Sequence, residues 1–293
     1  MSDLKLMTRQ LAKNPVSLAG LIIVVIFICI AIFAPLIAPP QGGDPYKIPH
    51  EGFSSEPQPP SREHPFGTTQ GQFDIFYGCI WGVRTAFRMA LVVIAVTLVI
   101  GIVLGSLAGY FGGVIDEVIM RITDIFLAFP SLILAMALVV VLGPGLRSVI
   151  IALCIVWWPS YARLIRGDIL QVREEDYVEA ARGVGAPSFR VIARHVLPNA
   201  IYPTLIMASL DIGAVVLVGA ALSFLGLGAP EGYADWGQMV EFSRNWIVGP
   251  PGEPLKYWYA PVIPGLFIVF FVLGWNLLGD AFRDIFDPRL ARR

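Results

Sequence analysis

The sequence predicts an all-α membrane protein with six transmembrane helices and one large polar loop between two of them. Hydrophobic residues make up 56% of the 293-residue chain and charged residues only 15%, whereas a soluble domain usually carries roughly 25% charged residues. The hydrophobic residues are collected in long runs, and a helix needs about 20 of them to cross the bilayer core. An Arg-rich polar segment, residues 176–199, separates the fourth run from the fifth.

Six hydrophobic segments are long enough, or nearly so, to cross a membrane as helices. They comprise residues 17–36, 87–110, 123–142, 148–162, 201–225 and 260–278. The fourth is short and ends in aromatic residues that suit a membrane interface, and Pro159 is expected to kink or end its apolar helix there. Basic residues before the first segment also fit a signal peptide, but its length and the lack of a convincing small-residue cleavage site favour an uncleaved span.

Six crossings place both termini on the same side of the membrane, and the positive charges indicate which side. With the N-terminus inside, fourteen of the 21 Lys and Arg residues lie in the inner segments, although the outer segments are longer overall. Cytoplasmic segments are enriched in Lys and Arg, so both termini are expected in the cytoplasm. The inner residues are Lys5, Arg9, Lys13, Arg121, Arg163, Arg166, Arg173, Arg182, Arg190, Arg194, Arg283, Arg289, Arg292 and Arg293.

Two outer segments have unusual compositions. Residues 38–82 contain eight prolines, which deny backbone donors and favour extended or irregular chain. Residues 226–259 are rich in Gly, Pro and Trp. Both segments are candidates to cover the outer mouth of a pore or to contact an external partner. The alternative, that they only connect helices, stays open for both.

The cysteines and histidines indicate neither a disulfide nor a metal site. Cys29, Cys79 and Cys154 lack the spacing of a disulfide framework or of metal ligands, so three unpaired thiols are expected. His50 and His64 have no further ligand spacing, which favours solvated loop histidines over a nickel site. An intramembrane enzyme would need a Ser–His or paired-Asp arrangement at membrane depth, and none is evident, so no catalytic residue is expected. The charges are segregated along the chain and indicate no nucleic-acid partner.

The polar segment 176–199 predicts two short helices separated at glycines. In the first helix acidic residues precede Arg182, and this order suits a helix dipole. Gly183 and Gly185 are expected to end the helix, since glycine is its usual terminator. Spacing of i, i+3, i+4 and i+7 gives it a small, mildly apolar face. The members of this face are Tyr177, Ala180, Ala181 and Val184.

The second helix is expected to begin at Pro187 and to end at Pro198. Its apolar residues recur at helical spacing and should lie against the transmembrane bundle. They are Phe189, Ile192, Ala193, Val196 and Leu197. Together the two helices would form a rigid L-shaped cytoplasmic handle on which a partner docks. From spacing alone, an amphipathic loop lying on the membrane surface is the alternative.

The same segment resembles the EAA loop of bacterial ABC importer permeases. The matching pattern is Glu179-Ala180-Ala181, three residues, Gly185, nine residues, His195, one residue and Leu197-Pro198. Histidine in place of the usual isoleucine, followed by Val196-Leu197-Pro198-Asn199, is similar to the peptide and nickel branch of that family. Further matches, at 31–39, 109–113, 222–228 and 279–289, extend the resemblance over nearly the whole chain. The chain resembles the C-type permease subunit of a dipeptide or oligopeptide importer.

One departure from this family lies on the outer side. Related permeases usually have a Gly-Arg-Asp element shortly after Gly-Thr, whereas Gly67-Thr68 is followed here by residues 69–74 without it, and Asp74 is the acidic position that remains. The departure leaves the cargo open, with peptides expected first, oligosaccharides second and nickel third. A channel subunit is the alternative from another class, although no carbonyl filter loop or acidic ring is visible.

The resemblance implies the type I ABC importer permease fold in a prokaryotic plasma or inner membrane. It divides the chain into a cytoplasmic N-terminal segment 1–16, a first transmembrane helix 17–37, an external Pro-rich loop 38–86, a permease core 87–282 with five spans and the EAA loop 163–199, and a cytoplasmic tail 283–293. It also implies a second permease subunit as heterodimer partner, two cytoplasmic ATP-binding subunits and an extracytoplasmic solute-binding protein. No GxxxxGK[ST] phosphate loop occurs, so ATP would be bound and hydrolysed by partners and this chain would need no cofactor of its own.

The resemblance further assigns the contact with an ATPase to seven residues. They are Asp176, Tyr177, Glu179, Ala180, Ala181, Gly185 and Pro198. Glu179 would contact the partner and the two alanines would allow a close fit. Gly185 would make the bend at which the handle turns.

Two features of the spans concern helix packing. Gly101, Gly105 and Gly109 form a ridge of small residues, for which helix packing is favoured over a substrate contact. Asp124 and Arg121 flank the inner end of the third span and are expected to form an interfacial ion pair.

Asp211 is the ionisable residue within the fifth span. A carboxylate near the midplane costs roughly 2.5–3.5 kcal/mol on insertion scales, so it normally faces a cavity or a partner. One expected role is contact with a polar or cationic substrate in the translocation path. The other, which is favoured, is a hydrogen bond or ion pair with the companion permease.

Overall fold

The computed structural model describes residues 14–286 of the chain except 51, 53, 55, 250 and 251. Its helices are α2 (Pro15–Ile37), α3 (Ile75–Phe111), α4 (Gly113–Leu127), α5 (Ser131–Leu142), α6 (Leu146–Val172), α7 (Asp176–Gly183), α8 (Ser188–Val191), a π-helix (Ile192–Val196), α9 (Leu197–Ala200), α10 (Tyr202–Phe224), α11 (Trp236–Phe242), a 3-10 helix (Arg244–Trp246) and α12 (Tyr259–Phe286). Most of the predicted N-terminal segment, with Lys5, Arg9 and Lys13, and the end of the predicted tail lie outside the described residues.

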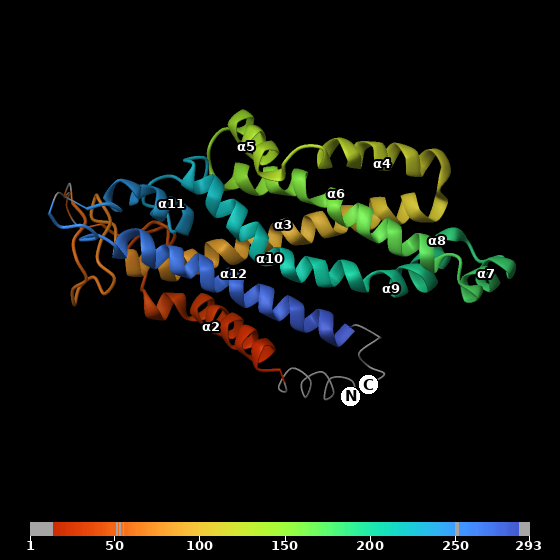
Figure 1. Ribbon diagram of the computed structural model, residues 1–293, viewed down its shortest axis with the longest axis horizontal. Helices are drawn as coiled ribbons and strands as arrows, with labels where there is room; N and C mark the ends of the chain where they lie inside the picture. The colour runs from red at the N-terminus through yellow and green to blue at the C-terminus, as the bar shows by residue number, and fades with distance from the viewer. Residues whose placement is uncertain (1–13, 51, 53, 55, 250–251, 287–293) are drawn as a thin grey trace.

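The long helices run side by side along the longest axis of the molecule (Figure 1). Five of them, α2, α3, α6, α10 and α12, are long and apolar enough to cross a membrane. The irregular segments before α3 and around α11 gather at one end of this bundle, and α7 lies at the opposite end (Figure 1). The predicted all-α membrane protein is confirmed, with five candidate spans among the described residues, or six if α4 and α5 count as one broken span.

The predicted third span, residues 123–142, is not one straight helix. α4 begins earlier, at Gly113, and α5 follows it at an angle of 88° after a break of three residues, 128–130. Pro130 explains the break, because a proline disfavours helical backbone at the residue before it and cannot donate a hydrogen bond to the turn it follows. The sequence pattern missed this because residues on both sides of the break are apolar.

The second span begins at Ile75 rather than at the predicted residue 87, so the external Pro-rich loop ends at Asp74. The Asp74 side chain caps the helix by accepting a 2.8 Å hydrogen bond from the Tyr77 backbone N–H. Gly78, Gly82 and Arg84 lower the hydropathy of this first part of α3, so the sequence predicts loop there. Both glycines lie against α11, where an added Cβ would overlap Met239 and Trp236 respectively.

The fourth span is also longer than predicted. α6 continues through Pro159 to Val172, so this proline does not end the helix. The helix therefore extends from the end of the bundle near α11 to the end near α7 without a break (Figure 1).

The ridge of glycines on α3 packs against α6, as predicted. A Cβ at Gly101 would overlap Tyr161, one at Gly105 would overlap Ile165, and one at Gly109 would lie 2.9 Å from the carbonyl oxygen of Arg166. The absence of side chains lets the two backbones approach closely over about two turns.

The two segments that the sequence places on the outer side pack on each other and form one layer, here called the outer cap after that predicted location and defined as residues 38–74 and 225–258. The Ile48 N–H donates to the Gly232 carbonyl and the Ala234 N–H to the Tyr46 carbonyl, both at 2.8 Å. Tyr257 donates to a carboxylate oxygen of Glu56 at 2.6 Å. These contacts join segments far apart in sequence into one packed unit.

Candidate functional site: the elbow and the carboxylate of α10

The polar loop forms a compact unit between α6 and α10, here called the elbow and defined as residues 173–201. Its first helix, α7, has Asp176 and Glu179 in the first turn and Arg182 in the last, which matches the helix dipole. The helix ends at Gly183, and Gly185 follows with φ at +81°. Only glycine adopts this left-handed backbone without strain. The prediction that glycines end the first helix is confirmed.

One face of the elbow is locked onto the end of α6 by a small apolar core. Val178, Val191 and Val196 of the elbow are completely buried, and they pack with Ile165 and Ile169 of α6. Protein cores are close-packed and transmit displacement rather than absorb it. The elbow and the C-terminal part of α6 are therefore one rigid unit.

A second contact ties the elbow to α3. The guanidinium of Arg182 lies 5.0 Å from the ring centroid of Tyr110, in cation–π geometry. Tyr110 also packs against the apolar core of the elbow. The last turn of α7 is thus held by α3 as well as by α6.

The predicted apolar stripe of the second helix is wrong at Phe189 and at Ala193, which is also exposed, whereas Val196 is buried and Ile192 and Leu197 are half-buried. Phe189 is 81% exposed, whereas its neighbour Val191 is buried. Pro187 does precede the helix at its N-cap, but residues 192–196 form a π-helix, and Pro198 lies in the first turn of α9 rather than ending the run. The wider π turn rotates the inward face relative to an ideal α pattern. Periodicity alone gives no signal for such a turn.

The face of the elbow that points away from α6 exposes large apolar side chains among charged ones. Tyr177 is 44% exposed, Val184 85% and Phe189 81%. Of the other predicted coupling residues, Asp176, Glu179, Ala180, Gly185 and Pro198 are exposed, while Ala181 is half-buried against the elbow core. Sequence reasoning missed Phe189 as a surface residue, because its spacing matched the buried set.

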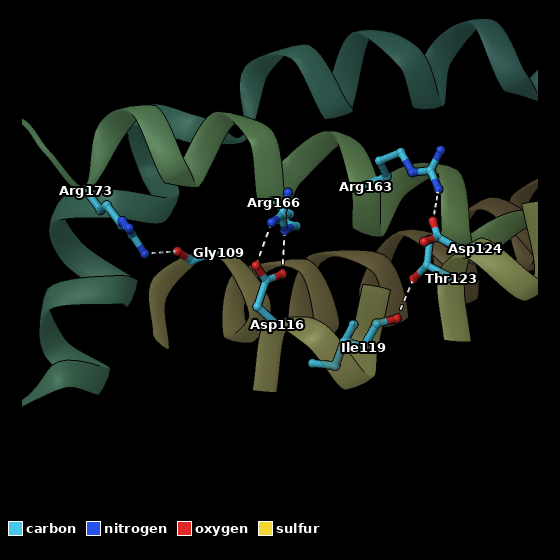
Figure 2. A network of polar contacts seen from close by, with 8 residues as sticks. All are labelled: Gly109, Asp116, Ile119, Thr123, Asp124, Arg163, Arg166 and Arg173. Carbon is cyan, nitrogen blue, oxygen red and sulfur yellow. Dashed lines mark hydrogen bonds and ion pairs between the residues drawn. The ribbon is translucent and has the colours of Figure 1, made fainter. Parts of the chain in front are cut away.

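Arg163 and Arg166, on the half of α6 nearest the elbow, bind α4, and Arg173, which follows α6, binds the end of α3 (Figure 2). Arg166 donates its Nε and Nη2 to the two carboxylate oxygens of Asp116, each at 2.5 Å. Arg163 pairs with Asp124, and Arg173 donates to the carbonyl oxygen of Gly109 at 2.8 Å. α4 is therefore attached to the helix that carries the elbow.

The predicted pairing of Asp124 with Arg121 is wrong. Asp124 pairs with Arg163 of α6, and Arg121 lies one turn from Glu117 on the surface of α4, at 3.8 Å. The sequence could not distinguish the two, because partners in different helices leave no spacing signal.

Asp211 of α10 makes its hydrogen bonds within the chain. Its Oδ2 accepts from the indole Nε1 of Trp157 at 3.1 Å and from the hydroxyl of Tyr161 at 2.8 Å. Trp157 and Tyr161 are four residues apart on α6 and so share one face of it. From the sequence, the aromatic residues at this end of the span were expected at a membrane interface, although the i, i+4 spacing of two aromatic donors was a usable signal for a shared acceptor.

The outer cap contains a buried carboxylate. Asp235 caps α11 by accepting from the Gln238 N–H at 3.0 Å, and it accepts from the Ser223 hydroxyl at 3.2 Å. Burial raises the pKa of Asp235 above its ordinary value, and these hydrogen bonds oppose the shift. A polar hollow of about 410 Å³ lies beside it, lined in part by Glu231, Glu241 and Arg244.

His64 is not an isolated loop residue, since its Nδ1 lies 2.6 Å from Oδ2 of Asp74. In the described part of the chain, no group of three or more His, Cys, Asp or Glu residues is arranged to hold a metal ion. The cysteines at 29, 79 and 154 are free thiols.

Sequence comparisons place this geometry among known transport proteins. Residues 101–292 match the family of binding-protein-dependent transport system inner membrane components, and residues 2–60 match the N-terminal transmembrane domain of oligopeptide transport permease C. The chain is 40% identical over 282 residues to the dipeptide transport system permease protein DppC of Alkalihalophilus pseudofirmus, covering 96% of this chain and 88% of the relative. It is 39% identical over 280 residues to a probable D,D-dipeptide transport system permease protein DdpC of Escherichia coli, covering 96% and 90%.

Comparison with solved structures supports the fold. A chain of the MetNI methionine ABC transporter in an inward-facing conformation aligns with a TM-score of 0.57 and 20% identity, covering 72% of this chain and 97% of that one. A chain of an amino acid ABC transporter aligns with a TM-score of 0.53 and 16% identity, covering 70% and 92%. Identities this low show the ABC importer permease fold alone.

A component of this kind is a multi-pass permease of the inner membrane and not the ATPase. The match of the family model to most of the chain and the identities of 40% and 39% over nearly its full length agree on one assignment. The chain therefore belongs to the family of binding-protein-dependent transport system inner membrane components, in the branch of C-type permease subunits of dipeptide and oligopeptide ABC importers.

Proposed function

We propose that this chain forms half of a translocation path for peptides and that its elbow receives the movement of a separate ATPase. The observation that carries the proposal is the two-sided construction of the elbow. Its inner face is locked into α6 by a buried core, while its outer face presents exposed apolar side chains. A surface of this kind on a rigid support suits a docked partner that moves it.

The exposed residues suit specific roles in that contact. Tyr177, Val184 and Phe189 would fill apolar positions in a groove of the ATPase. Asp176 and Glu179 would provide a polar rim at the N-terminal end of α7. Ala180 would permit close approach, and Gly185 would hold the bend between the two arms of the elbow.

The displacement of α7 would then reach the membrane by two routes. One runs through the elbow core to Ile165 and Ile169 of α6. The other runs along the chain through α9 into α10. A closing movement of paired ATPases would thus turn α6 and α10 and open or close the path.

Peptides are the proposed cargo because of the relatives' names. These relatives are described as permeases for dipeptides, D,D-dipeptides and, at 36% identity, oligopeptides. Oligosaccharides and nickel remain alternatives within the same transporter class. A channel subunit is the alternative from another class, and single-channel current from the purified chain alone would favour it.

The proposed assembly contains a second permease subunit, two ATP-binding subunits on the elbow side and a solute-binding protein on the outer cap. Both termini would lie in the cytoplasm with the elbow. The excess of Lys and Arg in the segments on that side supports this orientation. The chain itself would need no cofactor, because ATP would bind to the partner subunits.

Cross-linking through single cysteines tests the docking. In a chain whose cysteines at 29, 79 and 154 are replaced by alanine, Tyr177→Cys should form a cross-link to the ATPase subunit. Leu255→Cys, 64% exposed on the outer cap, is the matched control and should not reach the ATPase. Labelling of Tyr177→Cys by a membrane-impermeant thiol reagent applied from outside would contradict the proposal, as would a cross-link from Leu255→Cys alone.

A further inference from the structure

Asp211 connects two transmembrane helices that enter and leave the elbow. Its Oδ2 accepts hydrogen bonds from Trp157 at 3.1 Å and from Tyr161 at 2.8 Å, so α10 is bound to α6 at two points through one oxygen. We call these three residues the Asp211 staple. A polar group at this depth requires partners, and here the chain supplies them itself.

The α6 side of the staple is held firmly. Tyr161 is completely buried, and it also lies against Gly101 of α3, where an added Cβ would overlap it. The ring therefore has little freedom to follow Asp211 if α10 moves alone. The Tyr161 hydroxyl donor is fixed relative to both α3 and α6.

The staple lies at a distance from the elbow along both helices. At 1.5 Å per residue, Tyr161 is roughly 18 Å along α6 from Arg173, and Asp211 is roughly 15 Å along α10 from Ile201. α6 and α10 are thus joined at one end by the elbow and again inside the membrane by the staple. Two separate joins prevent the helices from splaying apart or rotating independently.

We infer that Asp211 is a positioning residue of the transport cycle, whose hydrogen bonds to Trp157 and Tyr161 make α6 and α10 move as one body when the elbow is displaced. The inference rests on the proposed role of the elbow. It differs from both roles expected for Asp211 from the sequence, contact with the substrate and contact with the companion permease. Without the staple, displacement of the elbow would bend α6 relative to α10 and would not move the two helices together.

The chemistry of the staple distinguishes two substitutions of Asp211. Asn keeps a side-chain oxygen that can accept from Trp157 and Tyr161, whereas Leu has a similar size and no acceptor. Tyr161→Phe removes one donor and keeps the Cβ that packs against Gly101. Ser209→Ala is the matched control on α10, because the Ser209 hydroxyl bonds the Ile206 carbonyl of its own helix at 2.7 Å.

The test is a double-mutant cycle on the reconstituted importer, with the binding protein present, that measures peptide molecules taken up per ATP hydrolysed. Asp211→Leu should lower this ratio about three- to tenfold, the range expected for an interhelical hydrogen bond in a membrane. Asp211→Asn and Ser209→Ala should stay near the wild-type ratio. The double variant with Tyr161→Phe and Asp211→Leu should be no worse than Asp211→Leu alone, because both remove the same contact.

Three results would overturn the inference. Additive losses in the double variant would mean that the two residues act separately. If Asp211→Asn lowered the ratio of peptide uptake to ATP hydrolysis as much as Asp211→Leu does, and changed the KM for cationic but not for neutral peptides, Asp211 would contact the substrate. If the second permease dissociated from the Asp211→Leu variant, while the Tyr161→Phe variant kept the wild-type ratio of peptide uptake to ATP hydrolysis, Asp211 would contact the other subunit.

The staple and the elbow can fail separately. The Tyr177→Cys cross-link to the ATPase is measured in parallel, in the cysteine-free background with and without the substitutions at Asp211 and Tyr161. If the chain with intact Asp211 and Tyr161 forms no cross-link, the elbow proposal is wrong. A cross-link that persists while the cycle is additive would remove the staple alone. If Asp211→Leu does not assemble, the test uses Tyr161→Phe, alone and together with Asp211→Asn. A lower ratio of peptide uptake to ATP hydrolysis in Tyr161→Phe would support the staple, and an unchanged ratio would overturn it.

Discussion

Arg166 of α6 and Asp116 of α4 form a two-point ion pair, with each guanidinium nitrogen 2.5 Å from its carboxylate oxygen. Their side chains are 30% and 18% exposed, so water screens this pair less than the neighbouring pair of Arg163 and Asp124, at 53% and 57%. The two-point geometry also fixes the rotation of α4 about its axis. The half of the broken span nearest the elbow is therefore attached to the helix that the elbow is expected to move.

Replacing Arg166 with Ala should lower the free energy of unfolding by about 1–2 kcal/mol, because Asp116 keeps its charge without a partner. Arg166→Lys should recover part of the loss, since an ammonium offers a point charge in place of a fork. Thermal unfolding in detergent, followed by Trp fluorescence, measures both. Arg163→Ala is the control and should cost no more than about 1 kcal/mol because its pair is more exposed. If Arg163→Ala lowered the free energy of unfolding as much as Arg166→Ala or more, the more buried ion pair would not be the stronger one.

Gly185 should be intolerant of side chains although there is room for them. A Cβ built at Gly185 meets nothing within 4 Å, but the backbone φ of +81° costs a residue with a side chain roughly 1–2 kcal/mol. Gly185→Val should therefore leave assembly intact, shift the bend of the elbow and lower peptide uptake more than ATP hydrolysis. Gly185→Asn should fall between, because Asn tolerates this conformation better.

Gly183→Ala is the matched control for Gly185. It lies in helical backbone at the end of α7 and is likewise open around its Cβ position. Alanine in a helix is favoured over glycine, so uptake and ATP hydrolysis should both be retained. Normal uptake in Gly185→Val, or equal loss in Gly183→Ala, would show that the bend has no role in coupling.

The long hydrophobic helices were predictable because their composition follows from the lipid around them. The elbow was predictable in outline, since Gly183, Gly185 and Pro187 mark the break between its two arms through local backbone chemistry. Its buried face was not, because the π-helix at residues 192–196 moves Val191 inward and Phe189 outward. A single wide turn is decided by tertiary packing and leaves no period in the sequence.

Contacts between distant helices were the other limit. The pairing of Asp124 with Arg163 and of Asp211 with Tyr161 depends on how α4, α6 and α10 are arranged in space. Charge or hydrogen-bonding capacity shows that a buried group needs a partner, but many residues offer the same chemistry. The start of α3 at Ile75 was missed for a related reason, since Gly78 and Gly82 serve packing against α11 and look like loop residues in isolation.

Gly105→Ala should separate α3 from α6. The added methyl group would overlap Ile165 and the Ala162 carbonyl, and the backbone oxygen cannot move aside as a flexible side chain would. Overpacking of this kind typically costs 1–3 kcal/mol, so we expect thermal unfolding at a lower temperature by about that free energy. Gly265→Ala, where nothing lies within 4 Å of the Cβ position, is the control and should be neutral or slightly stabilising. Full stability of Gly105→Ala would mean that the two helices do not pack through this ridge.

Asp235 should make the outer cap more stable at acidic than at alkaline pH. Burial raises its pKa in the folded protein, so the stability linked to its neutral form is fully present below the unfolded value, about 3.9, and is lost as the pH rises through the higher folded pKa. Asp235→Asn keeps the cap of α11 without a titrating group, and the difference in unfolding free energy between Asp235→Asn and wild type should grow as the pH rises above the unfolded pKa of about 3.9. Asp235→Ala also removes the cap, so it should be about 1 kcal/mol less stable than Asp235→Asn at either pH. A difference that is constant with pH would show that the Asp235 carboxyl titrates at its ordinary value, and a less stable Asn variant at pH 8 would show that its charge is favourable where it is buried.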